Sequence, residues 1–146
     1  MRILIAAALV ALTVPVLALA SAQSMSPVVS ATLKGVSEAG VKGDPNGSGF
    51  VVVHLSTAKR TVCWQFSKVK NIAKPTMAHI HKGAKGVSGP VVVPFGTSYK
   101  AKGCVKAAKA MIEKIETRPN RYYVNIHNAK YPAGAIRGQL VVGMHG

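Results

Sequence analysis

The chain has 146 residues, and its 19 Lys and Arg against 4 Asp and Glu give a formal net charge of +15. This length suits one domain with a single core, and the excess of cations attracts anionic surfaces in general. The four acids are split between a glycine-rich segment and a helical one, which argues against the paired carboxylates of a glycoside hydrolase. Few aromatic residues lie among the lysines, so a dedicated groove for single-stranded nucleic acid is poorly supported.

Residues 1–22 have the pattern of a secretory signal peptide. Arg2 precedes a long apolar run, and the small residues at 20–22 form a cleavage pattern. A retained membrane anchor is the alternative, but Pro15 interrupts the run. We therefore expect an extracytoplasmic protein, periplasmic or secreted, whose mature chain begins near Gln23 and has no further membrane span.

Short runs rich in β-branched and aromatic residues predict strands in the first two thirds of the chain. They lie at 26–35, 50–56, 60–67, 77–81 and 89–95. Four glycines and a proline between the first two runs indicate a turn-rich connection. In the run at 60–67, Val62, Trp64 and Phe66 share one face, so Trp64 is interpreted as a core anchor.

The remaining third of the chain predicts a helix followed by two strands. From Cys104 the apolar residues follow a helical period, with Val105, Ile112 and Ile115 on one side, until Pro119 ends it. This basic amphipathic segment could lie on a membrane, although packing on its own domain is more usual. Strands at 121–128 and 135–142 follow. The expected fold is all-β, an antiparallel immunoglobulin-like sandwich or barrel with one short helix.

Cys63 and Cys104 are the two cysteines of the chain. In an exported protein a structural disulfide between them is the default expectation. A soft-metal site that uses both thiolates is the alternative, but no CxxC spacing supports it.

Three histidines form the most informative pattern. Side chains two apart on a strand share a face, so His79 and His81 point the same way, and the alternation in 121–128 puts Tyr123, Asn125 and His127 opposite the apolar face. If both apolar faces turn to the core, all three histidines turn outward. Such a set can hold zinc or copper. The alternative is a structural network in which the histidines and Asn125 hydrogen-bond loops.

Several motifs together resemble one known family. They are AHIHKG at 78–83, GPVV at 89–92, YYVNIHNAKYPAGAIRGQL at 122–140, and the cysteine contexts VCW and GCV. With these motifs, residues 27–142 resemble the CHRD domain, named for its occurrence in chordin. The resemblance implies an all-β, immunoglobulin-like or barrel-like, extracytoplasmic domain of largely undefined activity. His79, His81 and His127 lie inside these motifs, whereas His54 and His145 do not.

The last motif also contains Arg137. Many relatives carry Glu where Ala135 stands, and a charge pair between that acid and Arg137 would be missing here. Arg137 would then neutralise an anionic ligand, pair with another carboxylate, or be held by backbone carbonyls.

These patterns predict an exported, non-enzymatic binding or structural module, with copper or zinc as the possible cofactor at His79, His81 and His127. No nucleophile elbow and no glycine-rich phosphate motif is recognisable. One alternative is a basic adhesion module for an anionic polymer or a cell-envelope component. A copper-dependent redox enzyme is the minor alternative.

Overall fold

The computed structural model describes residues 27–143, and the predicted signal peptide at 1–22 lies outside them. Within these residues, nine strands and one α-helix follow one another, so the expectation of an all-β fold with one short helix is confirmed. The strands are β1 (Val28–Lys34), β2 (Ser48–Ser56), β3 (Thr61–Lys70), β4 (Pro75–Lys82), β5 (Val91–Pro94), β6 (Lys102–Lys106), β7 (Tyr122–Asn128), β8 (Ile136–Gln139) and β9 (Val141–Val142). The helix is α1 (Lys109–Thr117), and two short 3-10 turns are η1 (Gly35–Ser37) and η2 (Pro119–Arg121).

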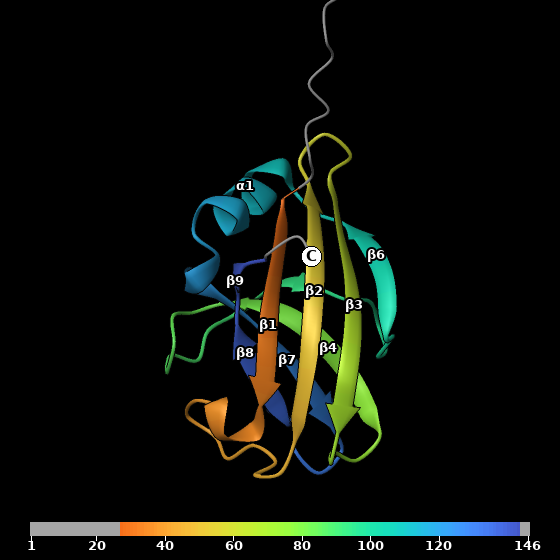
Figure 1. The fold of residues 1–146 in the computed structure, drawn as a ribbon, viewed down its shortest axis with the longest axis vertical. Helices are drawn as coiled ribbons and strands as arrows, with labels where there is room; N and C mark the ends of the chain where they lie inside the picture. The colour runs from red at the N-terminus through yellow and green to blue at the C-terminus, as the bar shows by residue number, and fades with distance from the viewer. Residues whose placement is uncertain (1–26, 144–146) are drawn as a thin grey trace, which may run out of the picture.

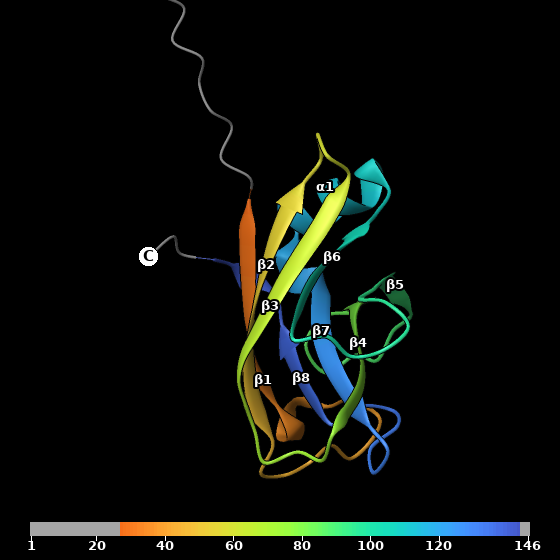
Figure 2. The same ribbon diagram turned by 90° about the vertical axis from the view of Figure 1, so that its right-hand side faces the viewer.

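The strands form one nearly closed, barrel-like antiparallel sheet. Its order is β5-β4-β7-β8-β1-β2-β3-β6, with β9 paired to β1 outside this path. Figures 1 and 2 show β1, β2 and β3 as one wall, β4, β7 and β8 as the facing wall, and α1 at one end. Because β1 pairs with both β2 and β8, the two walls are continuous, and the barrel alternative describes the fold better than two separate sheets.

The core lies between the two walls and is built from alternate residues of each strand. Trp64 is 4% exposed, and its ring stacks on Phe95 with the centroids 4.3 Å apart. The Trp64 indole N–H donates to the carbonyl of Lys100, so burial leaves no unpaired donor there. Trp64 is therefore the core anchor that the alternation in 60–67 predicted.

The two cysteines lie opposite each other on neighbouring strands. Cys63 of β3 and Cys104 of β6 are register partners with their Cα atoms 4.0 Å apart, and they form a disulfide. The expected pairing is thus present, and it joins the last strand of the sheet order to the rest of the barrel.

The helix begins later than its apolar period predicted. Residues 102–106 form β6, in which Val105 pairs with Val62 of β3, and α1 starts only at Lys109. The assignment of Val105 to the helix was therefore wrong, because pairing with a neighbouring strand overrides a local helical pattern. Ile112 and Ile115 are fully buried, so α1 packs on its own domain. None of the helices within 27–143 is long and apolar enough to cross a membrane.

The predicted strand at 135–142 is divided in two. Leu140 separates the two parts; its side chain is fully buried and its N–H donates to the carbonyl of Tyr122. Gly138 lies in the first half, and a Cβ at this position would run into the Thr32 carbonyl of β1. This close approach allows β8 to pass beside β1, as expected for a glycine within a strand.

Candidate metal centre

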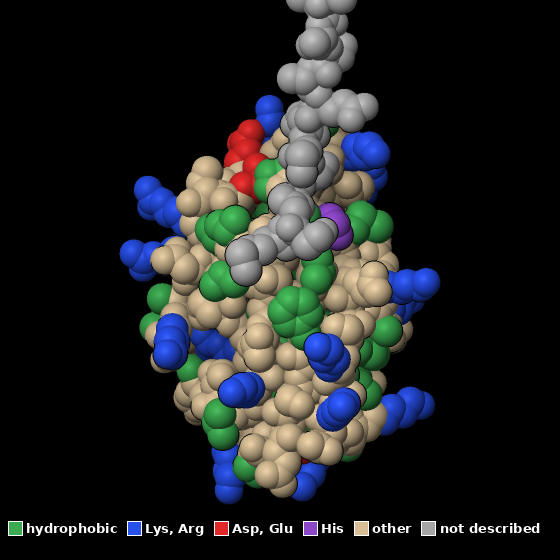
Figure 3. All heavy atoms as spheres, viewed as in Figure 1, with side chains coloured by type: hydrophobic (Ala, Val, Ile, Leu, Met, Phe, Trp, Pro, Cys, Tyr) green, Lys and Arg blue, Asp and Glu red, His purple; other side chains and the backbone are tan. Residues whose placement is uncertain are grey.

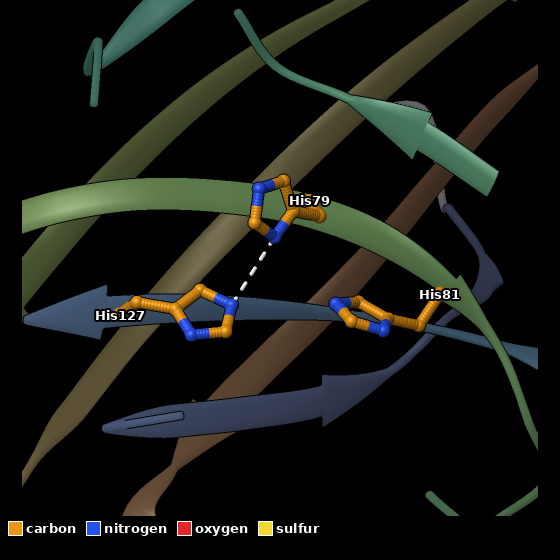
Figure 4. A group of neighbouring side chains, drawn as sticks. All are labelled: His79, His81 and His127. Atoms are coloured by element: carbon orange, nitrogen blue, oxygen red, sulfur yellow. Dashed lines mark hydrogen bonds between the residues drawn. The ribbon is translucent and has the colours of Figure 1, made fainter. Parts of the chain in front are cut away.

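The pairing of β4 with β7 brings the three histidines together. His79 and His81 project from one face of β4, as their spacing predicted, and their register partners on β7 are Asn125 and Tyr123. His127 of β7 is the partner of Met77. One ring nitrogen from each histidine can be chosen so that all three lie within 4.8 Å of one another. Figure 4 shows the rings converging from the two strands.

The histidines turn away from the core, as the strand alternation predicted, but two of them are nevertheless buried. His81 is 9% exposed and His127 is 7% exposed, whereas His79 is half-buried. Segments on either side of β4 and β7 fold over this face, namely the 83–90 loop and the 129–135 turn. Strand alternation reports which face a residue occupies, but it cannot report what covers that face.

Backbone carbonyls fix the rings of the two buried histidines. Nδ1 of His81 lies 2.8 Å from the Gly89 carbonyl oxygen, and Nδ1 of His127 lies 2.9 Å from that of Pro132. A carbonyl can only accept, so each Nδ1 carries the proton and donates it. In the neutral ring, Nε2 is then left with a free lone pair. This arrangement, with one nitrogen held by the protein and the other available, is typical of metal-binding histidines.

These available lone pairs gather in one place with few donors among them. Nε2 of His127 lies 3.1 Å from Nδ1 of His79 and 3.0 Å from Oδ1 of Asn125. Nε2 of His81 is buried and has no hydrogen-bond partner. His79 can donate one proton to His127, but His81 then still lacks a partner. A cation would satisfy these acceptors together.

Burial keeps the rings neutral, which is the form that binds a metal. Burial, and then repulsion from His127 and His81, lowers the pKa of His79 from 6.5 to about 4. Burial also lowers the pKa of His81 and of His127. All three imidazoles are therefore neutral rather than cationic near pH 7, so none has to lose a cationic proton before a metal binds.

The spacing of the nitrogens suits a small transition metal after a slight closure. Zinc-to-nitrogen bonds are about 2.0–2.1 Å, so two imidazole ligands of one ion lie at most about 4.2 Å apart. The 3.1 Å between His79 and His127 falls within this limit. The widest separation, within 4.8 Å, needs a ring to move by about half an ångström or more. Three nitrogens could then hold one ion, and the Asn125 amide oxygen lies 3.0 Å from Nε2 of His127.

A stack of flat side chains supports the cluster from one side. The Tyr123 ring lies parallel to His81, with the centroids 4.8 Å apart and the planes at 11°. The guanidinium of Arg137 covers Tyr123, 3.3 Å from its ring centroid. The backbone N–H of Gly89 donates to the Tyr123 hydroxyl, so the same stack also holds the 83–90 loop. His81 is therefore fixed both by its carbonyl and by the ring beside it.

Arg137 is buried behind the cluster, at 2% exposure. It donates to the carbonyl of Ala84 at 3.0 Å, so backbone carbonyl and aromatic face together hold it. Glu38 lies nearby, with its carboxyl against Gly134. Burial raises the pKa of Glu38 to about 7, although the charge of Arg137 opposes this shift. A carboxyl group therefore does lie near Arg137, although position 135 is Ala; it belongs to Glu38, which follows η1.

The structure therefore brings together most of the residues that the sequence singled out. Asn125 contacts the histidines, and Arg137 reaches them through Tyr123. The contributions of Tyr123 and Glu38 were missed. Tyr123 could have been found, because strand alternation places it on the same face of β7 as His127. Glu38 could not, because it lies in the connection before β2, where no sequence pattern indicates a contact with Arg137.

A family model described as the CHRD domain matches residues 29–140. This range contains all three histidines, both cysteines and Arg137. No match to the chain was found among curated proteins, and none among solved structures.

Proposed function

The chain belongs to the CHRD domain family, and from this premise we propose that it binds one copper or zinc ion through His79, His81 and His127. The observation that carries the proposal is how the nitrogens of the buried histidine rings are hydrogen-bonded. In His81 a backbone carbonyl holds Nδ1 while the buried Nε2 has no partner, and in His127 a carbonyl holds Nδ1 while Nε2 faces Nδ1 of His79. A purely structural network would be expected to pair both nitrogens of a buried ring.

The ligand types favour copper and zinc over magnesium or calcium. Neutral imidazole suits copper and zinc, whereas magnesium and calcium prefer oxygen ligands. No acidic side chain of the described residues belongs to the cluster. With nitrogen ligands the affinity order places copper(II) above zinc. We therefore expect copper(II) to bind more tightly than zinc and zinc to compete for the same site.

We propose a binding role rather than catalysis, and an extracytoplasmic location. The disulfide between Cys63 and Cys104 supports an oxidising compartment. The signal-peptide pattern at 1–22 supports export. Intact mass measurement of the protein recovered from an expressing bacterium tests the location, because export predicts an N-terminus near Gln23 and two fewer hydrogens than the reduced chain.

Calorimetric titration of the mature protein with copper(II) or zinc tests the metal site. We expect one ion per chain, and a loss of affinity of about 100-fold or more when His79 is replaced by Ala, since removing even an outer partner of a ligand costs 10–100-fold. The His79 ring makes no bond to the backbone in the described structure, so this variant should fold. His54→Ala is the matched control, because it removes an exposed imidazole from β2.

A second measurement separates metal binding from a structural network. A bound ion stabilises the folded state, so zinc should raise the melting temperature of the natural protein and of His54→Ala, but not that of a variant with Gln at all three positions. If the protein takes up no metal at neutral pH, or if uptake survives the triple replacement, the proposal is wrong.

A further inference from the structure

A concave site lies against the 83–90 loop, which also contacts the histidine cluster through Gly89. It is a pocket of about 910 Å³ between this loop and the C-terminal end of α1 with η2. Figure 1 shows the turn between α1 and η2 above the loop. Four cationic side chains line it and no acidic one does, so we call it the cationic pocket; they are Lys82, Lys114, Arg118 and Arg121.

The charges of the cationic pocket are not neutralised within the described structure. The one ion pair between side chains of residues 27–143 joins Lys109 and Glu113, outside the pocket lining. Lys and Arg side chains are spread over the face seen in Figure 3, and the acidic side chains visible there lie mainly beside α1. Gathering four cations around one cavity costs free energy through repulsion, and an anionic ligand would offset this cost.

Stabilisation of α1 explains only part of this arrangement. A cation near the C-terminal end of a helix is favourable, which accounts for Lys114 and Arg118. Lys82 belongs to β4 and not to the helix, yet it lines the same cavity. The four side chains therefore share the cavity and not the helix end. Guanidinium groups form paired hydrogen bonds with the oxygens of carboxylate, sulfate or phosphate.

The other residues that line the cationic pocket indicate which kind of ligand would carry the anionic groups. Val87 and Pro90 offer apolar contacts, and Ser88 and Thr117 offer hydroxyls. The aromatic residue in the lining, Tyr122, is only 4% exposed, so it has no free face on which a nucleobase could stack. The volume is within the range of sites for ligands larger than a single ion. Apolar and hydroxyl contacts beside these cations match a sugar ring that carries anionic groups.

We infer that the cationic pocket binds an anionic saccharide, with its carboxylate or sulfate groups held by Lys114, Arg118, Arg121 and Lys82. The ligand source is either a free sugar acid or a segment of an acidic polysaccharide. This site is separate from the metal centre, because none of the three histidines lines it.

The test compares two variants that lose the same charge. Lys114→Gln with Arg118→Gln removes two cations from the pocket, and Lys70→Gln with Lys74→Gln removes two exposed cations elsewhere. The probes, titrated by calorimetry at physiological ionic strength, are a heparin-derived tetrasaccharide, glucuronic acid, a neutral maltotetraose and a single-stranded DNA tetranucleotide. Circular dichroism checks that both variants fold, and copper(II) titration checks that both keep the metal centre.

We expect the tetrasaccharide to bind the natural protein, and the pocket variant to bind it about tenfold or more weakly, because charged hydrogen bonds are lost. The control variant should lose less than about twofold, since screening weakens distant charges. Saturable binding of glucuronic acid would support a free sugar acid, and binding of the tetrasaccharide alone would support a polymer. Equal weakening in both variants, absence of binding, or equal affinity for the DNA probe would overturn the inference.

Discussion

Acidification should destabilise the metal-free protein through the buried imidazoles. The folded-state pKa of His79 lies near 4, below its ordinary value of 6.5. Between these values the unfolded chain binds more protons than the folded one, so the free energy of unfolding must fall as the pH falls. The contribution of His79 is complete above about pH 6.5 and is lost progressively down to about pH 4.

The size of this effect follows from the two pKa values. Between pH 7 and pH 4.5 they correspond to about 2 kcal/mol in the free energy of unfolding. The His79 ring is half-buried, and water screens part of this cost, so we expect about 1 kcal/mol from it. The pKa values of His81 and His127 are lowered in the same direction and add to the loss.

Glu38 acts in the opposite sense within an overlapping range. Its folded-state pKa is raised from 4.5 to about 7, so its protonated form favours the folded state, and this contribution is lost as the pH rises from about 4.5 to 7. The total pH dependence of the natural protein therefore mixes two effects of opposite sign. The contribution of the histidines is therefore obtained by comparing the change in unfolding free energy between variants that all keep Glu38.

Urea denaturation at pH 7 and pH 4.5, with a chelator present, supplies that comparison. His79→Gln should lose about 1 kcal/mol less stability between the two pH values than the natural protein does. His54→Gln should behave like the natural protein, because His54 lies exposed on β2. If His79→Gln and His54→Gln lose the same amount on acidification, His79 is not held as a neutral ring, and the reasoning fails.

Three further predictions concern residues that hold the barrel together or support the histidine cluster. Replacing both Cys63 and Cys104 with Ala should lower the free energy of unfolding by about 2–4 kcal/mol in urea, because the unfolded chain is no longer cross-linked; an unchanged midpoint would refute this. Arg137→Lys should cost about 1–3 kcal/mol by the same assay, because a lysine cannot both cover Tyr123 and reach the Ala84 carbonyl as a planar guanidinium does. Gly138→Ala should cost about 1–3 kcal/mol in thermal or urea unfolding, since its Cβ would overlap the β1 backbone; native stability in this variant would contradict the close approach.

The sequence was most informative where strand alternation decides the outcome. His79 and His81 share a face, and the opposite placement of Val124 and Asn125 on β7 follows from a period of two. The cysteine pair was predictable from the cell compartment that the leader pattern implies. These inferences depend only on local geometry and on the number of cysteines.

The parts that could not be predicted depend on contacts between distant segments. The carbonyls of Gly89 and Pro132 that fix two histidines belong to connections, whose course over a sheet has no simple sequence signal. Val105 was misassigned because its strand partner, Val62, is far away in the chain. The cationic pocket likewise combines Lys82 with cations of α1 and η2, which only the folded barrel brings together.

The disulfide between β3 and β6 also affects how the molecule meets other copies of itself. β6 ends the hydrogen-bonded order of the sheet, so β3 would become an unprotected edge if β6 peeled away. Exposed edges invite strand addition from other chains and hence aggregation. Because Cys104 tethers β6 directly opposite Cys63, local fraying cannot carry the strand far from its partner. The covalent bond thus acts as a guard against intermolecular β-pairing as well as a cross-link within the fold.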